Sequence, residues 1–418
     1  MTNFRLYALL FIIQPFLALI VAFYNKRWEL FRVVLWLYAG YYGFTIAVGA
    51  ESQGSDIVRY IAEMQSLHNK SFDTLSSYWS YYQNSGEIDF LRSFLAISVS
   101  RFTESQNVLL LIYGLIFGYF YSGNTFLVLK YLRLNTFYNK LLFFSFLLIM
   151  PLWTMGGFRF NTSVHMFTYG VLLYFFEGNR KALIYCFLTP LVHFSFLIPV
   201  SLLVGFSFFK KMNIRFFFLF FALSFFAPSF SSNTIQTYIN SVGNQTFQER
   251  TDSYVDENKV SNYRESSNTV FSGKRNWYAD LYTKGYRWVI FGYLLLFYFK
   301  RKSLTLKNKE NILFKLSLLI FGFTNLIDDI PSGKRFFLIA ELIATALILV
   351  VLYRHSIFRF IKIYKLVSLP LVLLFLIVSI RAGLLLTSVE GVFANPLLVL
   401  FMNGEYTDLN SLLRAITG

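Results

Sequence analysis

The feature that most constrains this chain is a series of apolar runs, most of them near the length that crosses a lipid bilayer and some of them shorter. An α-helix needs about 20 apolar residues to span the hydrocarbon core. The runs cover residues 4–24, 29–49, 107–129, 138–156, 159–176, 182–209, 216–229, 288–299, 311–327, 336–353 and 366–386. Within lipid the backbone must satisfy its own hydrogen bonds, which a helix does inside one segment. The runs therefore predict an all-α, polytopic integral membrane protein.

The composition supports this class and excludes others. The 418 residues are 56% hydrophobic and only 14% charged, whereas soluble domains have about 25% charged residues. This excludes a cytosolic enzyme and a disordered chain. The net charge of +16 comes from Lys and Arg that flank apolar runs, which is typical of topology determinants and not of nucleic-acid binding. The single cysteine, Cys186, excludes an intrachain disulfide and a cysteine-based zinc site.

The run at 182–209 differs from the others because it is too long for one simple span. Pro190 and Pro199 interrupt it, and basic residues flank both of its ends. If both flanks are cytoplasmic, the segment must enter and return as two short helices, with His193 near the turn. A single, strongly tilted helix is the alternative.

Clusters of Lys and Arg between the runs set the expected orientation: Lys26–Arg27, Lys130 with Arg133 and Lys140, Arg180–Lys181, Lys210–Lys211 with Arg215, Lys300–Lys302 with Lys307 and Lys309, and Arg354 with Arg359, Lys362 and Lys365. With these clusters in the cytoplasm, the chain forms about twelve membrane segments, short broken helices included, and both termini lie outside. We expect a single transmembrane domain over 1–418, and tight external turns near residues 157, 190 and 330. The longer external parts are a first loop at 50–106 with amphipathic or re-entrant segments, a second loop at 230–286 and a C-terminal tail at 387–418.

Three cations lie on the side of the membrane that this rule disfavours. Arg159 lies at one expected external turn, and Lys334 and Arg335 lie at another. Charges at membrane depth are costly and usually face a cavity or a partner. The guanidinium group presents a fixed fork of donors that matches phosphate oxygens. These residues are candidate anion ligands; snorkelling, or pairing with Asp328 or Asp329, is the alternative.

The first external loop contributes carboxylates. Asp56 and Arg59 are three residues apart and share a helix face, so they either pair with each other or bind a sugar hydroxyl and a phosphate. Glu87 and Asp89 come just before an apolar stretch. They either cap the helix that follows or include a carboxyl with a raised pKa that acts as a general base.

Two of the four histidines, His165 and His193, lie in apolar segments. A membrane histidine is either a hydrogen-bonding residue between helices or a group that takes up a proton near neutral pH. His193 is the stronger functional candidate because it lies at an expected external turn.

The second external loop ends in a stretch that mixes aromatic and cationic residues. Arg275, Trp277 and Tyr278 belong to it, and Tyr286–Trp288 follow. Aromatic faces beside cations suit an anionic sugar chain. The same pattern marks an aromatic belt at the membrane surface, which is the favoured interpretation for Tyr286–Trp288.

Taken together, these positions resemble the EpsG-like branch of bacterial polysaccharide polymerases, which is related to the Wzy-type O-antigen polymerases. The resemblance covers residues 50–340 and rests on the order and placement of short motifs. The motifs are Gly54-Ser55-Asp56 with Arg59-Tyr60, Glu87, Gly156-Gly157-Phe158-Arg159, His193-Phe194-Ser195 and Lys334-Arg335-Phe336-Phe337.

The family implies a reaction and a setting. Polymerases of this type move a growing glycan from undecaprenyl diphosphate onto the non-reducing-end sugar of a new lipid-linked repeat unit. The setting is the bacterial cytoplasmic (inner) membrane, with the active site on the periplasmic or extracellular side. The implied partners are the undecaprenyl-diphosphate-linked oligosaccharide, membrane lipids, a chain-length regulator and a repeat-unit flippase. No nucleic acid, cofactor or metal is implied.

The resemblance also assigns roles to residues. Four cations are expected to bind the diphosphate, whose charge grows in the transition state: Arg159 and Arg335 first, then Arg59 and Lys334. Three groups are candidates for the base that deprotonates the acceptor hydroxyl: His193 first, then Asp56 and Glu87. The candidate glycan-binding residues are Arg275, Trp277 and Tyr278.

Other functions share part of this pattern. An O-antigen-type ligase, or another polyprenyl-dependent glycosyltransferase, would use the same architecture with a different acceptor. A flippase for lipid-linked oligosaccharides would line a central path with charges at mid-depth on several spans, whereas the polar candidates here gather at one side. The hypothesis of a membrane acyltransferase is supported by His193 alone.

Overall fold

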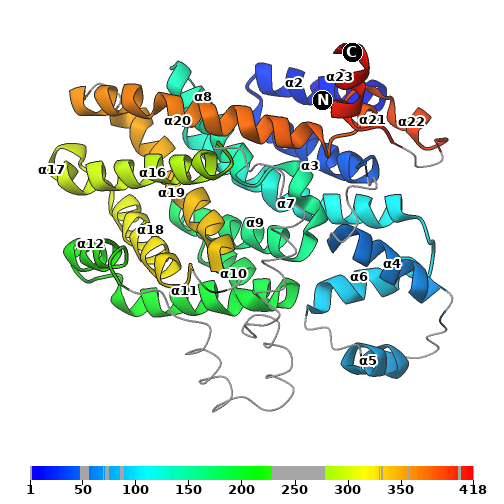
Figure 1. Ribbon diagram of the computed structural model, residues 1–418, viewed down its shortest axis with the longest axis horizontal. Helices are drawn as coiled ribbons and strands as arrows, with labels where there is room; N and C mark the ends of the chain where they lie inside the picture. The colour runs from blue at the N-terminus through cyan, green and yellow to red at the C-terminus, as the bar shows by residue number, and fades with distance from the viewer. Residues whose placement is uncertain are drawn as a thin grey trace. The chain divides into compact units, whose positions relative to one another are not determined.

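The protein is helical throughout the part of the chain that the structure describes. This computed structural model describes residues 2–47, 56–68, 70, 75–84, 89–132, 134, 136–227, 278–328, 330, 333–355, 358–402 and 406–417. Every regular element in these ranges is a helix (Figure 1). The chain divides into two compact units. Unit 1 comprises Met1–Leu197 and Leu376–Gly418, and unit 2 comprises Ile198–Phe375.

Within the described residues, four helical stretches are long and apolar enough to cross a membrane. They are Gln106–Tyr131, Phe137–Gly156, Gly333–His355 and Arg359–Leu384. Shorter apolar helices accompany them, among them Pro15–Tyr24 and Ile214–Leu223. These helices support the predicted all-α membrane protein, whereas the predicted count of about twelve membrane segments is not confirmed.

Unit 1 is built around α7, which packs against α3 on one side and α9 on another, while α9 also packs against α10. The α-helices of unit 1 are α1 (Thr2–Ile13), α2 (Pro15–Tyr24), α3 (Trp28–Phe44), α4 (Asp56–His68), α5 (Leu75–Asn84), α6 (Phe90–Ser100), α7 (Gln106–Tyr131), α8 (Phe137–Ile149), α9 (Phe158–Leu172), α10 (Leu183–Val192), α21 (Val389–Phe393), α22 (Pro396–Val399) and α23 (Leu409–Thr417). Its short 3-10 and π turns are η2 (Leu152–Gly156), η3 (Leu173–Glu177), η4 (Arg180–Ala182) and η5 (Phe194–Phe196).

Glycines bring α3 and α7 into backbone contact. A Cβ atom on Gly43 would collide with the carbonyl oxygen of Leu110, and one on Gly114 would collide with the carbonyl oxygen of Ala39. Close approach through small residues is typical of helix pairs in membranes, where packing replaces the hydrophobic effect as the main attraction. The sequence of both helices therefore fixes how closely they pack.

The first apolar run, at 4–24, forms two helices and not one. A residue that precedes proline is biased away from the helical conformation, and Gln14, which precedes Pro15, is extended, with φ −157° and ψ 101°. The Gln14 side chain accepts a hydrogen bond from the backbone N–H of Leu17 and so caps α2.

The first predicted external loop contains α4, α5 and α6, and α4 packs against α6. The predicted C-terminal tail forms α21, α22 and α23. Hydroxyl groups of α3 hold the start of this tail: Tyr41 donates to the carbonyl oxygen of Glu390 (2.8 Å), and Tyr42 donates to that of Leu386 (3.2 Å). Most of the second predicted loop lies outside the described residues.

Unit 2 is built around α19, which packs against α18 and α16. Its elements are α11 (Leu197–Phe209), α12 (Ile214–Leu223), α16 (Tyr278–Phe299), α17 (Arg301–Leu304), α18 (Asn308–Leu326), η6 (Gly333–Phe336), α19 (Phe337–His355) and α20 (Arg359–Leu384). The most apolar stretch of α19 is almost fully buried, whereas that of α20 is mostly exposed. The last residues of α20, from Leu376 onward, belong to unit 1.

The α3–α7 contact generates a stability prediction. Gly114→Ala is expected to lower the free energy of unfolding by about 1–3 kcal/mol, because the added methyl group meets backbone and not a flexible side chain. Gly205→Ala is the matched control, because nothing lies within 4 Å of its Cβ position. The control should be neutral or stabilising by up to about 1 kcal/mol, from helix propensity. Thermal unfolding in detergent measures the stability of both purified variants. Equal unfolding midpoints for Gly114→Ala and Gly205→Ala would contradict the close contact between α3 and α7.

Candidate functional site

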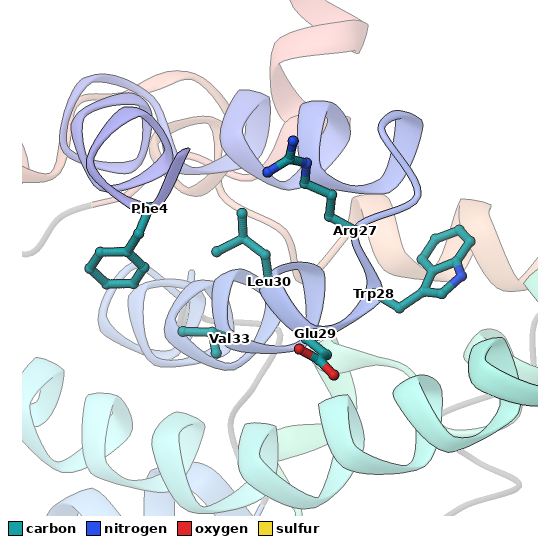
Figure 2. A pocket seen from close by; sticks show the side chains of 6 residues that line it. All are labelled: Phe4, Arg27, Trp28, Glu29, Leu30 and Val33. Atoms are coloured by element: carbon teal, nitrogen blue, oxygen red, sulfur yellow. The ribbon is translucent and has the colours of Figure 1, made fainter. Parts of the chain in front are cut away.

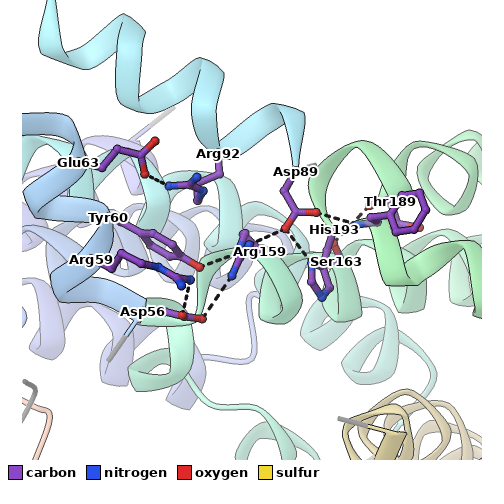
Figure 3. Close-up of polar contacts among 11 residues, drawn as sticks. Asp56, Arg59, Tyr60, Glu63, Asp89, Arg92, Arg159, Ser163, Thr189 and His193 are labelled. Atoms are coloured by element: carbon purple, nitrogen blue, oxygen red, sulfur yellow. Dashed lines mark hydrogen bonds and ion pairs between the residues drawn. The ribbon is translucent and has the colours of Figure 1, made fainter. Parts of the chain in front are cut away.

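Unit 1 contains a chain of charged and polar side chains that we call the Asp89 network. It consists of Asp56, Tyr60, Asp89, Arg159 and His193 (Figure 3). These residues come from α4, from the start of α6, from the first turn of α9 and from the residue that follows α10. Segments far apart in the sequence therefore contribute to one network.

The helix α10 ends at His193 for a local reason. Pro190 has no N–H, so the carbonyl oxygen of Cys186 loses its helical partner; the hydroxyl of Thr189 donates to that oxygen instead (2.6 Å). The last regular bond of α10 runs from the N–H of His193 to the carbonyl oxygen of Thr189 (2.9 Å). His193 itself is extended, with φ −150° and ψ 114°. The predicted division of the run at 182–209 into two short helices is confirmed.

Asp89 receives three hydrogen bonds from two other segments. Its Oδ1 accepts from the backbone N–H of Phe194 (2.8 Å). Its Oδ2 accepts from Nη1 of Arg159 (2.9 Å) and is 3.0 Å from Nδ1 of His193. The side chain is 4% exposed. Asp89 is the N-cap residue of α6, as the capping interpretation expects, but its side chain makes no capping hydrogen bond to that helix.

The pKa of the Asp89 carboxyl is lowered. Burial alone raises the pKa of a carboxyl, but the hydrogen bond from His193, the charges of His193 and Arg159 and the N–H of Phe194 outweigh that effect. The prediction of a carboxyl with a raised pKa at this position is therefore wrong for Asp89. A carboxyl with a low pKa is a weak base and a strong hydrogen-bond acceptor.

Arg159 lies in the first turn of α9, where a cation is disfavoured by the helix dipole. Its Nε donates to the hydroxyl oxygen of Tyr60 (2.7 Å), and its Nη2 is 3.9 Å from a carboxylate oxygen of Asp56. Together with Asp89, these groups offset the unfavourable position. The side chain is 21% exposed, so Arg159 is held by its partners and partly exposed.

Tyr60 is the aromatic centre of the network. Its ring is fully buried, and the guanidinium carbons of Arg59, Arg92 and Arg159 lie 5.6, 5.0 and 5.5 Å from the ring centre. Attraction between cations and the ring face favours this arrangement. Burial raises the pKa of Tyr60 to about 12, so its hydroxyl stays protonated at neutral pH. Arg92 is itself buried and forms an ion pair with Glu63.

The geometry of His193 suits proton uptake. A carboxylate only accepts hydrogen bonds, so Nδ1 facing Asp89 carries a hydrogen, and Nε2 of the neutral ring keeps a lone pair. Among the described residues, no group forms a hydrogen bond with Nε2. The ring is held by edge-to-face contact with Phe160 (5.8 Å between ring centres). Arg159 and His193 bond to the same carboxylate oxygen of Asp89. The guanidinium of Arg159 and the imidazole of His193 therefore lie side by side.

Asp56 and Arg59 form the ion pair that their spacing allows. The distance from Nη2 of Arg59 to Oδ1 of Asp56 is 2.7 Å, and both side chains are exposed. The pairing interpretation is therefore confirmed. Asp56 also reaches the edge of the network through its longer contact with Arg159.

The remaining predicted site residues lie in unit 2 or outside the described part of the chain. Lys334 and Arg335 are exposed residues of η6, and Tyr278 is the first residue of α16. The three others lie outside the described residues: Glu87, Arg275 and Trp277.

Sequence reasoning missed two members of the network and a buried cation beside it. Asp89 was considered only as one of two carboxylates before an apolar stretch, and Tyr60 and Arg92 were given no role. A charged residue such as Arg92 inside the apolar helix α6 is the signal that could have found this part of the network. His165 is fully enclosed, with Nε2 3.0 Å from the carbonyl oxygen of Met150, as expected for a histidine that links helices.

A metal site and a surface pocket are the two alternatives to the Asp89 network. Among the described residues, no group of three or more His, Cys, Asp or Glu side chains is arranged to hold a metal ion. An open pocket of about 540 Å³ lies beside the start of α3 (Figure 2). Its lining residues are Phe4, Arg27, Trp28, Glu29, Leu30 and Val33. None of them belongs to the Asp89 network, which remains the better candidate.

Comparison of the chain with protein-family models, with curated proteins and with solved structures finds no match.

The network generates a prediction about stability. Asp89→Asn is expected to lower the free energy of unfolding by about 3–5 kcal/mol, because it removes one partner of a buried, charge-paired group. Asp56→Asn is the control, and should cost about 0–1 kcal/mol because the Asp56–Arg59 pair is exposed. Thermal unfolding in detergent compares the two. Equal, small shifts would show that Asp89 does not hold the network together.

Proposed function

We propose that this protein is a polymerase that joins oligosaccharide repeat units carried on undecaprenyl diphosphate. The observation that carries the proposal is the carboxylate of Asp89, one oxygen of which bonds to both Arg159 (2.9 Å) and His193 (3.0 Å). A guanidinium fork that suits a diphosphate therefore lies beside an imidazole that suits a hydroxyl proton. The resemblance of the motif order to EpsG-like polymerases supports the same reaction.

The proposed site faces the outside of the bacterial cytoplasmic membrane. When the basic clusters are cytoplasmic, the turns that carry Arg159 and His193 are external, as are the long loops. A topology of about twelve membrane segments is part of this proposal. Lipid-linked repeat units would reach the site from the outer leaflet.

The proposed step is a displacement at the anomeric carbon of the donor sugar. The acceptor hydroxyl forms the new C–O bond and gives its proton to Nε2 of His193. The bond between the anomeric carbon and the diphosphate oxygen breaks, and the lipid diphosphate leaves with the bonding electron pair. Arg159 stabilises the negative charge that grows on this leaving group. The proton on His193 then passes to water or to the released diphosphate.

In this scheme Asp89 is a positioning residue. Its carboxylate orients the ring of His193 and stabilises the imidazolium that forms, as an aspartate does for a catalytic histidine in other enzymes. Asp89 also connects the two catalytic groups.

An O-antigen-type ligase is the alternative that uses the same cation and base. The two functions differ in the acceptor, which is a lipid-linked repeat unit for the polymerase and another glycolipid for the ligase. Incubation of the purified protein with one lipid-linked oligosaccharide distinguishes them, because only a polymerase makes a ladder of longer products.

The proposed role of Arg159 generates a prediction. Arg159→Ala and Arg159→Lys are expected to abolish long polymer in cells while single repeat units are still assembled and exported. Lys should fail because a point charge does not replace the bidentate fork, and the loss of one such donor costs about 10²–10³-fold in rate. Arg335→Ala is expected to have the same cellular phenotype. Electrophoresis of the glycan measures chain length.

Arg180→Ala is the control for this experiment, because Arg180 is an exposed residue of η4 and belongs to an expected cytoplasmic cluster. Its polymer should be normal. Long polymer from Arg159→Ala at a normal protein level would refute the diphosphate role.

The base assignment generates a second prediction. His193→Ala is expected to lower the rate of polymerisation by about 10²–10⁴-fold, the usual contribution of a general base. Asp56→Asn should retain most activity because Asp56 is paired with Arg59 at the surface. The rate is measured with purified protein and lipid-linked oligosaccharide. An active His193→Ala variant together with an inactive Asp56→Asn variant would move the base to Asp56.

A further inference from the structure

The function proposed above gives no role to Tyr60, although this residue contacts the cation that is proposed to stabilise the leaving group. Nε of Arg159 donates a hydrogen bond to the hydroxyl oxygen of Tyr60, at 2.7 Å (Figure 3). The Tyr60 side chain is fully buried, so a substrate does not touch it. Any effect of Tyr60 on the reaction must therefore pass through a neighbour, and Arg159 is the neighbour to which its hydroxyl bonds.

Two partners at different nitrogens determine how the guanidinium of Arg159 is turned. Tyr60 holds Nε, and Asp89 holds Nη1 at 2.9 Å. A planar group that is bonded at two of its three nitrogens cannot rotate without breaking one of these bonds. The contact of Nη2 with Asp56 is 3.9 Å long, beyond hydrogen-bonding distance. The orientation of the fork therefore depends on Tyr60 and Asp89 together.

Tyr60 provides an acceptor that carries no charge. Burial raises the pKa of Tyr60 to about 12, so the hydroxyl is neutral at pH 7. A carboxylate at Nε would cancel part of the positive charge with which Arg159 stabilises a departing diphosphate. A phenol satisfies the N–H donor and leaves that charge in place.

Two other rings connect the ring of Tyr60 to the start of α9. Tyr60 contacts Tyr113 of α7 edge to face, with 6.2 Å between ring centres. Tyr113 stacks on Phe158 at 4.0 Å, with the two ring planes 10° apart. Phe158 directly precedes Arg159, and all three rings are fully buried. Close-packed rings resist displacement, so this stack sets the distance from α4 to the backbone beside Arg159. The Tyr60 hydroxyl then fixes the side chain.

We propose that Tyr60 is a positioning residue whose hydroxyl sets the orientation in which Arg159 meets the diphosphate of the donor lipid. This inference rests on the role proposed above for Arg159. A guanidinium fork matches two phosphate oxygens only when its plane is turned toward them. A misplacement of about 1 Å can cost about 10²-fold in rate. Without the Tyr60 oxygen, Nε loses its acceptor and the fork can turn about its bond to Asp89.

The test separates the hydroxyl of Tyr60 from its ring. Tyr60→Phe removes the acceptor and keeps the ring, so the contacts of the ring remain and the variant is expected to fold. Tyr113→Phe is the matched control, because Tyr113 is an equally buried tyrosine that touches Tyr60. Among the described residues, the Tyr113 hydroxyl has no hydrogen-bond partner. Thermal unfolding in detergent checks that both variants are folded.

Calorimetric titration with inorganic pyrophosphate, on the full-length protein in nanodiscs, measures the effect on anion binding. Tyr60→Phe is expected to weaken the affinity about 10-fold, the usual effect of losing one hydrogen bond to a charged group. The number of sites per chain should not change. A smaller folded fraction would lower the number of sites and not the affinity, so this readout separates orientation from stability. Tyr113→Phe should bind like the wild type.

A double-mutant cycle shows whether Tyr60 acts through Arg159. Arg159→Lys has no Nε, so adding Tyr60→Phe to it should change the pyrophosphate affinity by less than about 2-fold, the range expected when no coupling remains to be lost. An equal loss in the wild-type and Arg159→Lys backgrounds would overturn the proposal. Wild-type affinity in Tyr60→Phe would also overturn it.

The same variants are then assayed for polymerisation of lipid-linked oligosaccharide, which keeps this inference distinct from the proposed function. The rate is expected to fall about 10- to 100-fold in Tyr60→Phe and to stay unchanged in Tyr113→Phe. A wild-type rate in Tyr60→Phe would overturn the positioning role and leave the polymerase function standing. If the wild type itself makes no longer glycan, the polymerase function fails, and the pyrophosphate titrations alone decide whether Tyr60 orients Arg159.

Discussion

The polar part of unit 1 depends on the carboxylate of Asp89. It joins the start of α6 to the first turn of α9 and to the break after α10. It neutralises Arg159, which the helix dipole would otherwise disfavour, and it satisfies the N–H of Phe194 where the helix is interrupted. Because one oxygen serves both Arg159 and His193, the spacing between a cation and a base follows from a single buried group.

Sequence reasoning predicted the local features of this site and missed the contacts that assemble it. Two prolines inside one apolar run were enough to predict the break at His193, because the loss of a backbone donor is a local effect. Local sequence could not show which of the two carboxylates, Glu87 or Asp89, belongs to the site. Asp89 meets its partners 70 and 104 residues along the chain, and those partners determine that its pKa falls where burial alone would raise it.

The same limit applies to Arg287. Flanked by Tyr286 and Trp288, it has the sequence pattern of a membrane-surface belt, yet its Nε contacts Glu341 on another helix. The apolar runs, by contrast, depend on the residues of each run alone, and four helical stretches of the described residues are long and apolar enough to cross a membrane. Helix α19 illustrates the difference: its apolar character is evident from the sequence, but the Arg287–Glu341 pair at one end depends on the packing of α16.

The division of the chain has a consequence for its biosynthesis. Unit 2 is an insertion, since unit 1 resumes at Leu376 after the sequence of unit 2 is complete. All members of the Asp89 network precede residue 198, so the ribosome delivers them early. The hydroxyls of Tyr41 and Tyr42 bond to the carbonyl oxygens of Glu390 and Leu386, which are translated only after unit 2. A segment translated after unit 2 thus covers a helix translated before it, and nascent chains arrested within unit 2 would leave that surface uncovered.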